Sequence, residues 1–390
     1  MGVSLASQKV WRELKVLGER LLYIPFHAVA PVAQRMYDRW YFPRLKRHTT
    51  TQFETAQKLA IFLCYTAKGV PVRAFATVDR LRRSGFEVLV VANGGLSSLE
   101  LKRLNESGVS SLRRPNWGYD FGGYRDGLRL LSVLNCSPSE LILMNDSIEY
   151  PVLSNDQLIE AMRNHGSDFV GAVHAKPVNP NGNEDYGVIF SFLLWASSNT
   201  LRSPAWQDFW ARYVMTGSKY ATVRRGERAL TRAMMRGGLR CGGVYTRDTF
   251  LGVVGALPAD ELRVAIEHGV YVDDEIFLRR ASQLIALPVE GDEWRGRALA
   301  FIQDVVAKRN FLYSFPYITH GALGVPFVKR SGATMQVAAY QSFLWLVKNG
   351  YLLKGLPNSV HDGDSDQSST DVLISKGGLF DAGKPSAGLD

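Results

Sequence analysis

The sequence has few cysteines for its length: Cys64, Cys136 and Cys241 are the three cysteines among 390 residues. Three widely separated cysteines provide neither a disulfide framework nor the spacing of a zinc ribbon, which indicates a reducing compartment. The sequence also lacks any run of about 18 apolar residues, and its N-terminus lacks the basic, apolar and small-residue zones of a signal peptide. We therefore expect a cytoplasmic protein.

Two common phosphate-binding motifs are missing as well. The first predicted strand, Leu59 to Tyr65, is not followed by G-x-G-x-x-G, and G-x-x-x-x-G-K-[ST] occurs nowhere in the chain. Their absence argues against a dinucleotide cofactor and against a P-loop nucleotide. The formal net charge of +9 is compatible with nucleic acid, an anionic membrane surface or a phosphorylated substrate. Because no aromatic-basic RNA signature or helix-turn-helix pattern is present, we expect no nucleic acid.

What the sequence does contain is a long alternation of short apolar runs and helical periodicity, beginning at residue 58. Such alternation is typical of an α/β fold, a mainly parallel sheet flanked by helices. The 46% hydrophobic content is sufficient for a sizeable core. We expect four parts: a basic amphipathic helical leader (1–57), an α/β domain (58–250), a mostly helical extension (251–356) and a disordered acidic tail (357–390).

The leader carries nine Lys or Arg against four acidic residues, interleaved with aromatic side chains such as Trp40 and Tyr41. This pattern fits peripheral contact with the headgroups of an anionic bilayer on the cytoplasmic face of the inner membrane, and it fits equally a pair of helices packed on the main domain. From residue 357 onward, Gly, Ser and Asp dominate, with six Asp against two Lys. Such a composition cannot bury enough apolar surface to fold.

The first segment with candidate chemistry runs from Asn116 to Gly127, N-W-G-Y-D-F-G-G-Y-R-D-G. Closely spaced glycines permit close approach of the backbone, and exposed amides at the start of the following helix can hold a phosphate. Asn116 and Asp120 would then be placed to bind ribose or base hydroxyls. The same residues are also common in an ordinary tight turn.

A second candidate is Asn145-Asp146-Ser147, at the carboxyl end of the apolar run Leu141 to Met144. An Asp at a strand end can hold a divalent cation, Mg²⁺ or Mn²⁺, that bridges both phosphates of a leaving diphosphate. Its alternative role is to cap the loop that leads to Tyr150.

A third candidate is Glu227, at a predicted helix start in R-R-G-E-R-A-L-T. A carboxylate there could act as general base on an acceptor hydroxyl, with Arg224 and Arg225 meeting phosphate. It could equally stabilise the helix N-terminus.

Taken together, these segments resemble the rhamnan synthesis protein F family over roughly residues 58–330. The Asn116 block and the N-D-S block are specific in combination, and the other blocks support them by their order. The quoted blocks are the first strand with Tyr65, N-W-G-Y-D-F-G-G-Y-R-D-G-L from Asn116, L-I-L-M-N-D-S from Leu141, D-F-V-G from Asp168, S-F-L-L-W from Ser191, E-R-A-L-T with Gly237 beyond it, and G-V-P-F-V-K-R from Gly324.

The resemblance implies a Rossmann-like fold of GT-A type and an inverting glycosyltransferase of surface-polysaccharide assembly. The donor would be a nucleotide-diphosphate sugar such as dTDP-rhamnose, and the acceptor a growing glycan or lipid-linked glycan. Glu227 would be the base and Asp146 would bind the metal or the diphosphate. The residues predicted to line the nucleotide-sugar site are Tyr65, Asn93, Asn116, Gly118, Asp120, Gly123, Asp126, Asn145 and Asp146.

One departure from the pattern is Ser147, which stands where inverting transferases carry a second carboxylate. A divalent cation would then have Asp146 as its one certain ligand from this strand end, so metal dependence stays open. A metal-free site would need cations such as Arg125, Arg224 or Arg225 beside the diphosphate. The alternative function is a non-catalytic scaffold of a polysaccharide-synthesis complex that retains the fold.

Overall fold

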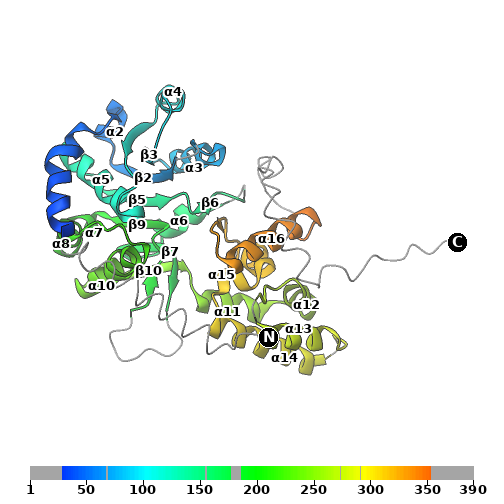
Figure 1. Cartoon of the computed structure of the whole chain (residues 1–390). Helices are drawn as coiled ribbons and strands as arrows, with labels where there is room; N and C mark the ends of the chain where they lie inside the picture. The colour runs from blue at the N-terminus through cyan, green and yellow to red at the C-terminus, as the bar shows by residue number, and fades with distance from the viewer. Residues whose placement is uncertain are drawn as a thin grey trace.

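A computed structural model gives the fold of the chain (Figure 1). The residues that the structure describes are 29–66, 69–153, 156–176, 186–272, 274–289 and 291–352. The acidic tail expected after residue 357 and the first half of the expected leader therefore lie outside the described residues.

The centre of the molecule is a nine-stranded, mainly parallel sheet, which confirms the predicted fold class. The strand order is β1-β4-β3-β2-β5-β9-β7-β10, and β8 pairs with β7 beside this path. Strand β9 is antiparallel to both β5 and β7, and β1 is antiparallel to β4 at the edge. The strands are β1 (Arg47–His48), β2 (Lys58–Tyr65), β3 (Glu87–Asn93), β4 (Ser110–Arg114), β5 (Glu140–Asn145), β7 (Phe169–Ala175), β8 (Val188–Ile189), β9 (Leu193–Ser197) and β10 (Cys241–Tyr245).

Side-chain alternation along β2 divides the core into two layers. Leu59, Ile61 and Leu63 face one layer, and the residues between them face the other. Both faces of a mainly parallel sheet are buried, which is why this strand is apolar at nearly every position.

The first layer lies between the sheet and one set of helices. It includes an aromatic stripe at helical spacing, of which Trp206, Trp210 and Tyr213 are buried and Phe209 is half-buried. The helical elements on this side are α2 (Thr51–Thr55), α5 (Tyr119–Val133), α7 (Ser198–Arg202), α8 (Pro204–Arg212), α9 (Lys219–Thr222), the π-helix η3 (Val223–Arg228) and α10 (Ala229–Arg236).

The second layer is covered by helices from two distant parts of the chain. Helices α3 (Val72–Arg83), α4 (Ser98–Glu106) and α6 (Leu158–Arg163) lie within the sheet domain. Ser97 and Glu100, whose spacing is typical of a capping box, form one at the start of α4. The region after residue 246 is mostly helical, as predicted, and shares this apolar layer with the sheet. Its helices are α11 (Arg247–Ala256), α12 (Ala259–Glu267), α13 (Glu275–Ile285), α14 (Gly291–Lys308), α15 (Phe311–Ser314), η4 (Tyr317–Ala322) and α16 (Thr334–Lys348).

A second, two-stranded sheet joins this helical region to the main sheet. Strand β11 (Val328–Lys329) pairs antiparallel with β6 (Ile148–Glu149), which directly follows the end of β5. The Arg330 amide donates to the Ser147 carbonyl at 2.8 Å, so the pairing extends to the end of β5. The C-terminal helical region therefore reaches the carboxyl edge of the main sheet.

The described part of the leader packs on the sheet domain through one face. Residues 29–36 are helical, followed by η1 (Tyr37–Tyr41) and the 3-10 helix η2 (Phe42–Arg44). The Gln34 amide donates to the Tyr213 carbonyl at 2.9 Å and its oxygen accepts from the Met215 amide at 2.7 Å. Packing on the main domain, one of the two alternatives for the leader, is thus observed for these residues.

One predicted strand is wrong in its extent. The sequence from Val188 to Trp195 indicates a single strand, but the structure has β8 and β9 separated by a turn at Ser191. The Ser191 amide donates to the Glu227 carboxylate at 2.6 Å instead of to a neighbouring strand. The interruption therefore arises from a side chain that the strand pattern does not contain.

Candidate functional site

Polar side chains gather where the parallel strands β2, β3, β4 and β5 end. Because carboxyl ends of parallel strands meet at one edge of a sheet, ligands commonly bind there. Tyr65 closes β2, Asn93 closes β3, and Asn145 closes β5 with Asp146 directly after it. The Tyr65 amide donates to Asp146 Oδ2 at 2.8 Å, and the Asp146 amide donates to the Leu63 carbonyl at 3.0 Å.

The glycine loop that follows β4 turns into helix α5 at the same edge. Gly118 is the N-cap of α5 with φ of 81°, and Tyr119 has φ of 51°, which is unusual for a residue with a side chain. Two successive left-handed residues bring Asp120 onto the first turn of the helix. There Asp120 Oδ2 accepts from Asn145 Nδ2 at 3.1 Å, so the glycine loop and the end of β5 converge.

Glu227 belongs to the same cluster although it comes from η3. Its Oε1 accepts from the Ser191 amide at 2.6 Å and from the Ser191 hydroxyl at 2.9 Å. Ser191 is itself held by Tyr124, whose phenol donates to the Ser191 carbonyl at 2.8 Å. The glutamate is therefore fixed between β8 and β9 on one side and α5 on the other, in a position that a simple helix-capping role does not require.

Asp120, Asp146 and Glu227, here called the carboxylate cluster, are each half-buried. Burial raises the pKa of all three, and the negative charge of Asp120 adds to the rise for Asp146 and Glu227. Half-buried carboxylates with raised pKa values that lie near one another are typical of a functional site.

Lys329 on β11 is a member of this site that sequence reasoning missed. Its Nζ donates to the hydroxyl of Ser147, and its charge lowers the pKa of both Asp120 and Glu227. The only sequence signal was its place in the block G-V-P-F-V-K-R, which carries no chemical pattern that points to Asp146.

Two of the predicted site residues, Asn145 and Asn93, are buried and hold the glycine loop by hydrogen bonds. Asn145 and Asn93 are 3% exposed. Asn145 orients Asp120, and Asn93 Nδ2 donates to Asn116 Oδ1 at 3.2 Å and to the Tyr119 carbonyl at 3.4 Å. Both asparagines therefore position the loop, and Asn116 itself is exposed.

Two predictions for this segment need correction. Asp126 is fully buried, and its Oδ2 accepts from Arg114 Nε at 2.6 Å and from the Tyr37 phenol at 2.6 Å, which leaves no surface for a nucleotide. Gly123 is also buried, and a Cβ there would lie 2.1 Å from Leu63 Cδ1. The glycine is needed for close packing of α5 on β2 and not for approach of a phosphate.

Of the three arginines predicted to lie beside the diphosphate, one forms an ion pair with the leader and two are exposed. Arg125 forms a bidentate ion pair with Asp38 of the leader, at 2.9 Å and 2.5 Å. Arg224 and Arg225 are exposed on η3. Lys329, and not Arg125, lies at the carboxylate cluster, and the charges of Arg73 and Lys219 also act on Asp146 and on Asp120, respectively.

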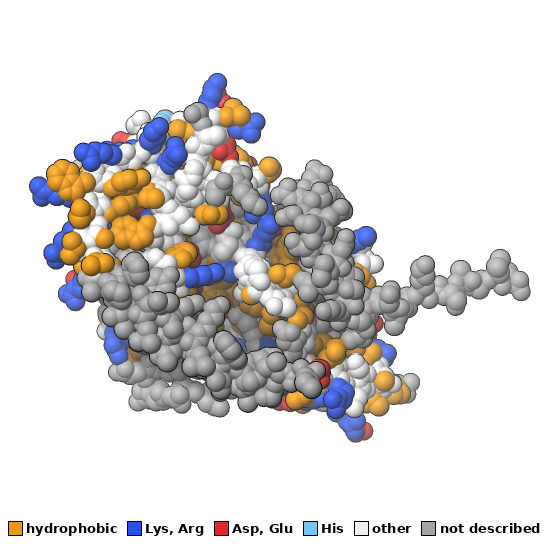
Figure 2. All heavy atoms as spheres, viewed as in Figure 1, with side chains coloured by type: hydrophobic (Ala, Val, Ile, Leu, Met, Phe, Trp, Pro, Cys, Tyr) orange, Lys and Arg blue, Asp and Glu red, His pale blue; other side chains and the backbone are white. Residues whose placement is uncertain are grey.

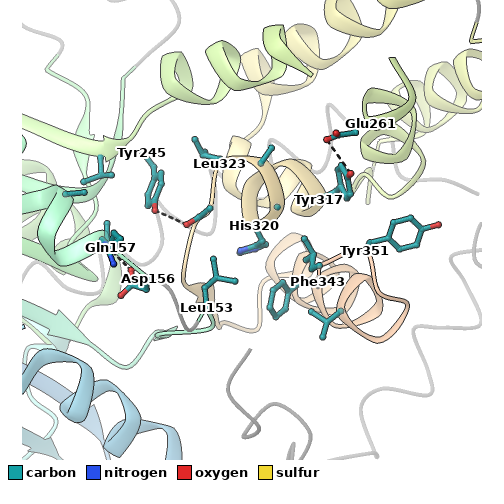
Figure 3. Close-up of a pocket in the computed structure, with 18 residues that line it drawn as sticks. Leu153, Asp156, Gln157, Tyr245, Glu261, Tyr317, His320, Leu323, Phe343 and Tyr351 are labelled. Carbon is teal, nitrogen blue, oxygen red and sulfur yellow. Dashed lines mark hydrogen bonds between the residues drawn. The ribbon is translucent and has the colours of Figure 1, made fainter. Parts of the chain in front are cut away.

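A separate cavity of about 730 Å³ lies where the C-terminal helices meet α6 and the end of β10 (Figure 3). Tyr245 and His320 line it, and the Tyr245 phenol donates to the Gly324 carbonyl at 3.1 Å. Tyr317 donates to Glu261 on another wall at 3.5 Å. None of its lining residues belongs to the carboxylate cluster.

Comparison with known proteins agrees with the predicted resemblance. Residues 88–250 match the family model described as Rhamnan synthesis protein F. The chain therefore carries a domain of this family, whose members are associated with polysaccharide synthesis. The match includes the glycine loop, Asp146 and Glu227, and it ends before Lys329.

A more distant similarity extends further along the chain. An uncharacterized protein, y4gN, of Sinorhizobium fredii (strain NBRC 101917 / NGR234) is 24% identical over 265 residues, which are 67% of this chain and 67% of the relative. None of the helices in the described part of the chain combines the length and the hydropathy that a membrane crossing needs.

Proposed function

We propose that the protein is an inverting glycosyltransferase that transfers a sugar, rhamnose or a similar hexose, from a nucleotide-diphosphate donor to a surface polysaccharide or its lipid-linked precursor. The observation that carries this proposal is the convergence of Asp120, Asp146 and Glu227 at the carboxyl edge of the sheet. The family match over residues 88–250 supplies the connection to polysaccharide synthesis.

Glu227 is the proposed general base. It takes the proton of an acceptor hydroxyl, whose oxygen forms a bond to the anomeric carbon of the donor. The bond from that carbon to the phosphate oxygen breaks, and its electron pair leaves with the nucleoside diphosphate. A raised pKa favours this role, because a carboxylate that binds protons more readily is a stronger base toward a hydroxyl.

The donor is proposed to lie between the glycine loop and the end of β5. Asn116 is exposed at the loop, and the N-cap of α5, Gly118, has no side chain to cap the helix start at the same edge, where helix amides can bind a phosphate. The Tyr65 side chain, 54% exposed beside Asp146, offers a ring for stacking on the base. Asp146 and Asp120 then flank the sugar and the diphosphate.

The acceptor is proposed to be reached at a membrane surface, because the described leader leaves an unusual outer face. Val29, Val32, Met36 and Trp40 form an exposed apolar stripe on it. Figure 2 shows hydrophobic side chains interspersed with Lys and Arg on the side of the molecule where this segment lies in Figure 1. The exposed charged residues between positions 29 and 50 are all basic: Arg35, Arg39, Arg44, Lys46 and Arg47.

The one acidic residue of this segment does not offset that charge. Asp38 is half-buried and is paired with Arg125 and Arg129 of α5. Apolar side chains surrounded by cations fit the headgroup region of an anionic bilayer. Such a contact would hold the enzyme where lipid-linked glycans are assembled.

The test of the proposed function is transfer or donor hydrolysis with a panel of nucleotide sugars and a lipid-linked glycan acceptor, with and without Mn²⁺. We expect turnover by the wild type, loss of turnover in Glu227→Gln, and full activity in Glu106→Gln, a control carboxylate exposed at the end of α4. Binding of a nucleoside diphosphate without any turnover would favour the scaffold function instead. Full activity of Glu227→Gln would remove the assigned base.

A further inference from the structure

The hydroxyl of Ser147 occupies the position where a second metal-binding carboxylate is expected, and it is already engaged. It receives a hydrogen bond from Lys329 Nζ and donates one to Asn145 Oδ1. Asn145 in turn donates a hydrogen bond from its Nδ2 to Asp120 Oδ2. Lys329, Ser147, Asn145 and Asp120 thus form one hydrogen-bonded chain across the candidate donor site.

The donor set at this position does not fit a divalent cation. Asp146 Oδ2 accepts from the Tyr65 amide, and an ammonium group lies on the neighbouring hydroxyl. Among the residues that the structure describes, no group of three His, Cys, Asp or Glu side chains is placed to hold a metal ion. A dication bound at Asp146 would also be repelled by the positive charge of Lys329.

The fold fixes Lys329 at this place through backbone bonds. Besides the pairing of β11 with β6, the Val152 amide donates to the Pro326 carbonyl at 2.8 Å. The ammonium lies over the ring of Phe192, 5.0 Å from its centroid, which favours the charged form. The position of Lys329 is therefore fixed by a paired strand and not by a free loop.

Lys329 faces the three carboxylates and keeps hydrogen-bond donors for a ligand. The side chain is half-buried, and its burial lowers the pKa of the ammonium, while Asp120, Glu227 and Asp146 counter this effect. An ammonium has three N–H donors, and Ser147 takes one of them. The remaining donors can serve the oxygens of a phosphate.

We propose that Lys329 stabilises the leaving nucleoside diphosphate in place of a divalent metal ion, so that the C-terminal helical region completes the donor site. This inference rests on the proposed glycosyl transfer. When the bond between the anomeric carbon and the phosphate oxygen breaks, the electron pair remains on that oxygen, and the Lys329 ammonium donates hydrogen bonds to the diphosphate. The proton taken from the acceptor stays on Glu227 until it is released to water.

The experiment is calorimetric titration of the full chain with dTDP, UDP and GDP, in EDTA and in Mn²⁺. For the nucleotide that binds, we expect the same Kd within about threefold in both solutions, because the cation belongs to the protein. Lys329→Met should weaken binding by about tenfold or more, since a hydrogen-bonded charge is lost. Lys329→Arg, which keeps the charge, should weaken it less, and Lys102→Met, an exposed control on α4, should not change it.

Two results would overturn the inference while leaving the proposed function intact. One is binding that needs Mn²⁺ in the wild type, a measurement that requires no variant. The other is unchanged affinity in Lys329→Met together with a loss in Lys219→Met, which would assign the cation to the exposed lysine of α9. If the wild type binds none of the three nucleotides in either solution, the proposed function fails and the inference fails with it.

Discussion

Asp126→Asn tests whether the charge at this position belongs to the fold or to the ligand site. Both side chains of the Arg114–Asp126 pair are fully buried, and the two atoms Nε and Oδ2 are 2.6 Å apart. The substitution keeps the shape of the side chain but leaves the guanidinium without a counter-charge. Removing one partner of a buried pair costs about 3–5 kcal/mol, so the free energy of unfolding should fall by that amount.

The loss of stability should also disturb the glycine loop, because Arg114 connects the Arg114–Asp126 pair to that loop. Its guanidinium donates to Asn93 Oδ1 at 2.5 Å and to the Trp117 carbonyl at 2.5 Å. Tyr37, whose phenol donates to Asp126, packs edge-on against Trp117 with ring centroids 5.3 Å apart. We therefore expect weaker nucleotide binding in Asp126→Asn as a consequence of lost stability.

Urea unfolding followed by far-UV circular dichroism measures the effect. The control is Asp208→Asn, which breaks an exposed pair with Arg212 one turn along α8 and should cost less than about 0.5 kcal/mol. A double variant, Arg114→Met with Asp126→Leu, should recover part of the loss, because it removes both buried charges. If Asp126→Asn kept the stability of the wild type and lost only nucleotide affinity, Asp126 would be a ligand contact and not a buried partner of Arg114.

Three further predictions concern other parts of the molecule. For the wild type, kcat/KM should fall as the pH drops through the raised pKa of Glu227, at a higher pH than an ordinary glutamate would give; an acid limb in the ordinary range would count against burial of the base. Because the folded state binds this proton more readily than the unfolded state, ionised Glu227 lowers stability at neutral pH, and Glu227→Gln should melt at the same or a higher temperature than the wild type, with a difference that shrinks as the pH falls. Met36→Ser with Trp40→Ser should reduce co-sedimentation with phosphatidylglycerol vesicles and leave the soluble activity unchanged, whereas equal binding to phosphatidylcholine vesicles would refute the electrostatic part of the argument. Gly123→Ala should lower the free energy of unfolding by about 1–3 kcal/mol, because its Cβ displaces Leu63; a loss of nucleotide affinity at unchanged stability would restore the predicted ligand contact.

The parallel strands could be predicted because a strand buried on both faces is apolar at almost every position. The runs at Leu59 to Tyr65 and Leu141 to Met144 are of this kind, and both appear within one residue of the expected bounds. Strand β10 was not predicted, since its sequence C-G-G-V-Y contains two glycines and has low β-propensity. It forms because the edge of β7 is available for pairing.

For site residues that lie on the same helix, the sequence could predict which of them reach the site. Asp120 and Asp126 look equivalent in the motif, but six residues at about 100° each place them about 120° apart around the helix. The residue on one side reaches the site and the residue on the other enters the core. The apolar positions Phe121, Tyr124 and Leu128 define this helical phase, and the acidic residues between them follow it.

Contacts between segments that are far apart in the sequence could not be predicted from local sequence patterns. Ser147 and Lys329 are 182 positions apart, and their hydrogen bond depends on how the helical region docks on the sheet. Ser191 and Glu227 are 36 positions apart, and their contact interrupts a strand that the local sequence favours. In both cases the tertiary partner decides the outcome, which is the usual reason that propensity fails.

The two ends of the described chain hold the candidate donor site from opposite directions. On one side, Tyr37 of the leader bonds to Asp126 and packs on Trp117, next to the glycine loop. On the other, β11 pairs with β6 directly after Asp146 and brings Lys329 to Ser147. Since neither segment lies within residues 88–250, the family domain alone contains the three carboxylates but neither Tyr37 nor Lys329. In the proposed donor complex, Lys329 would offset part of the repulsion between the three half-buried carboxylates and the diphosphate, while the leader would hold the glycine loop in place.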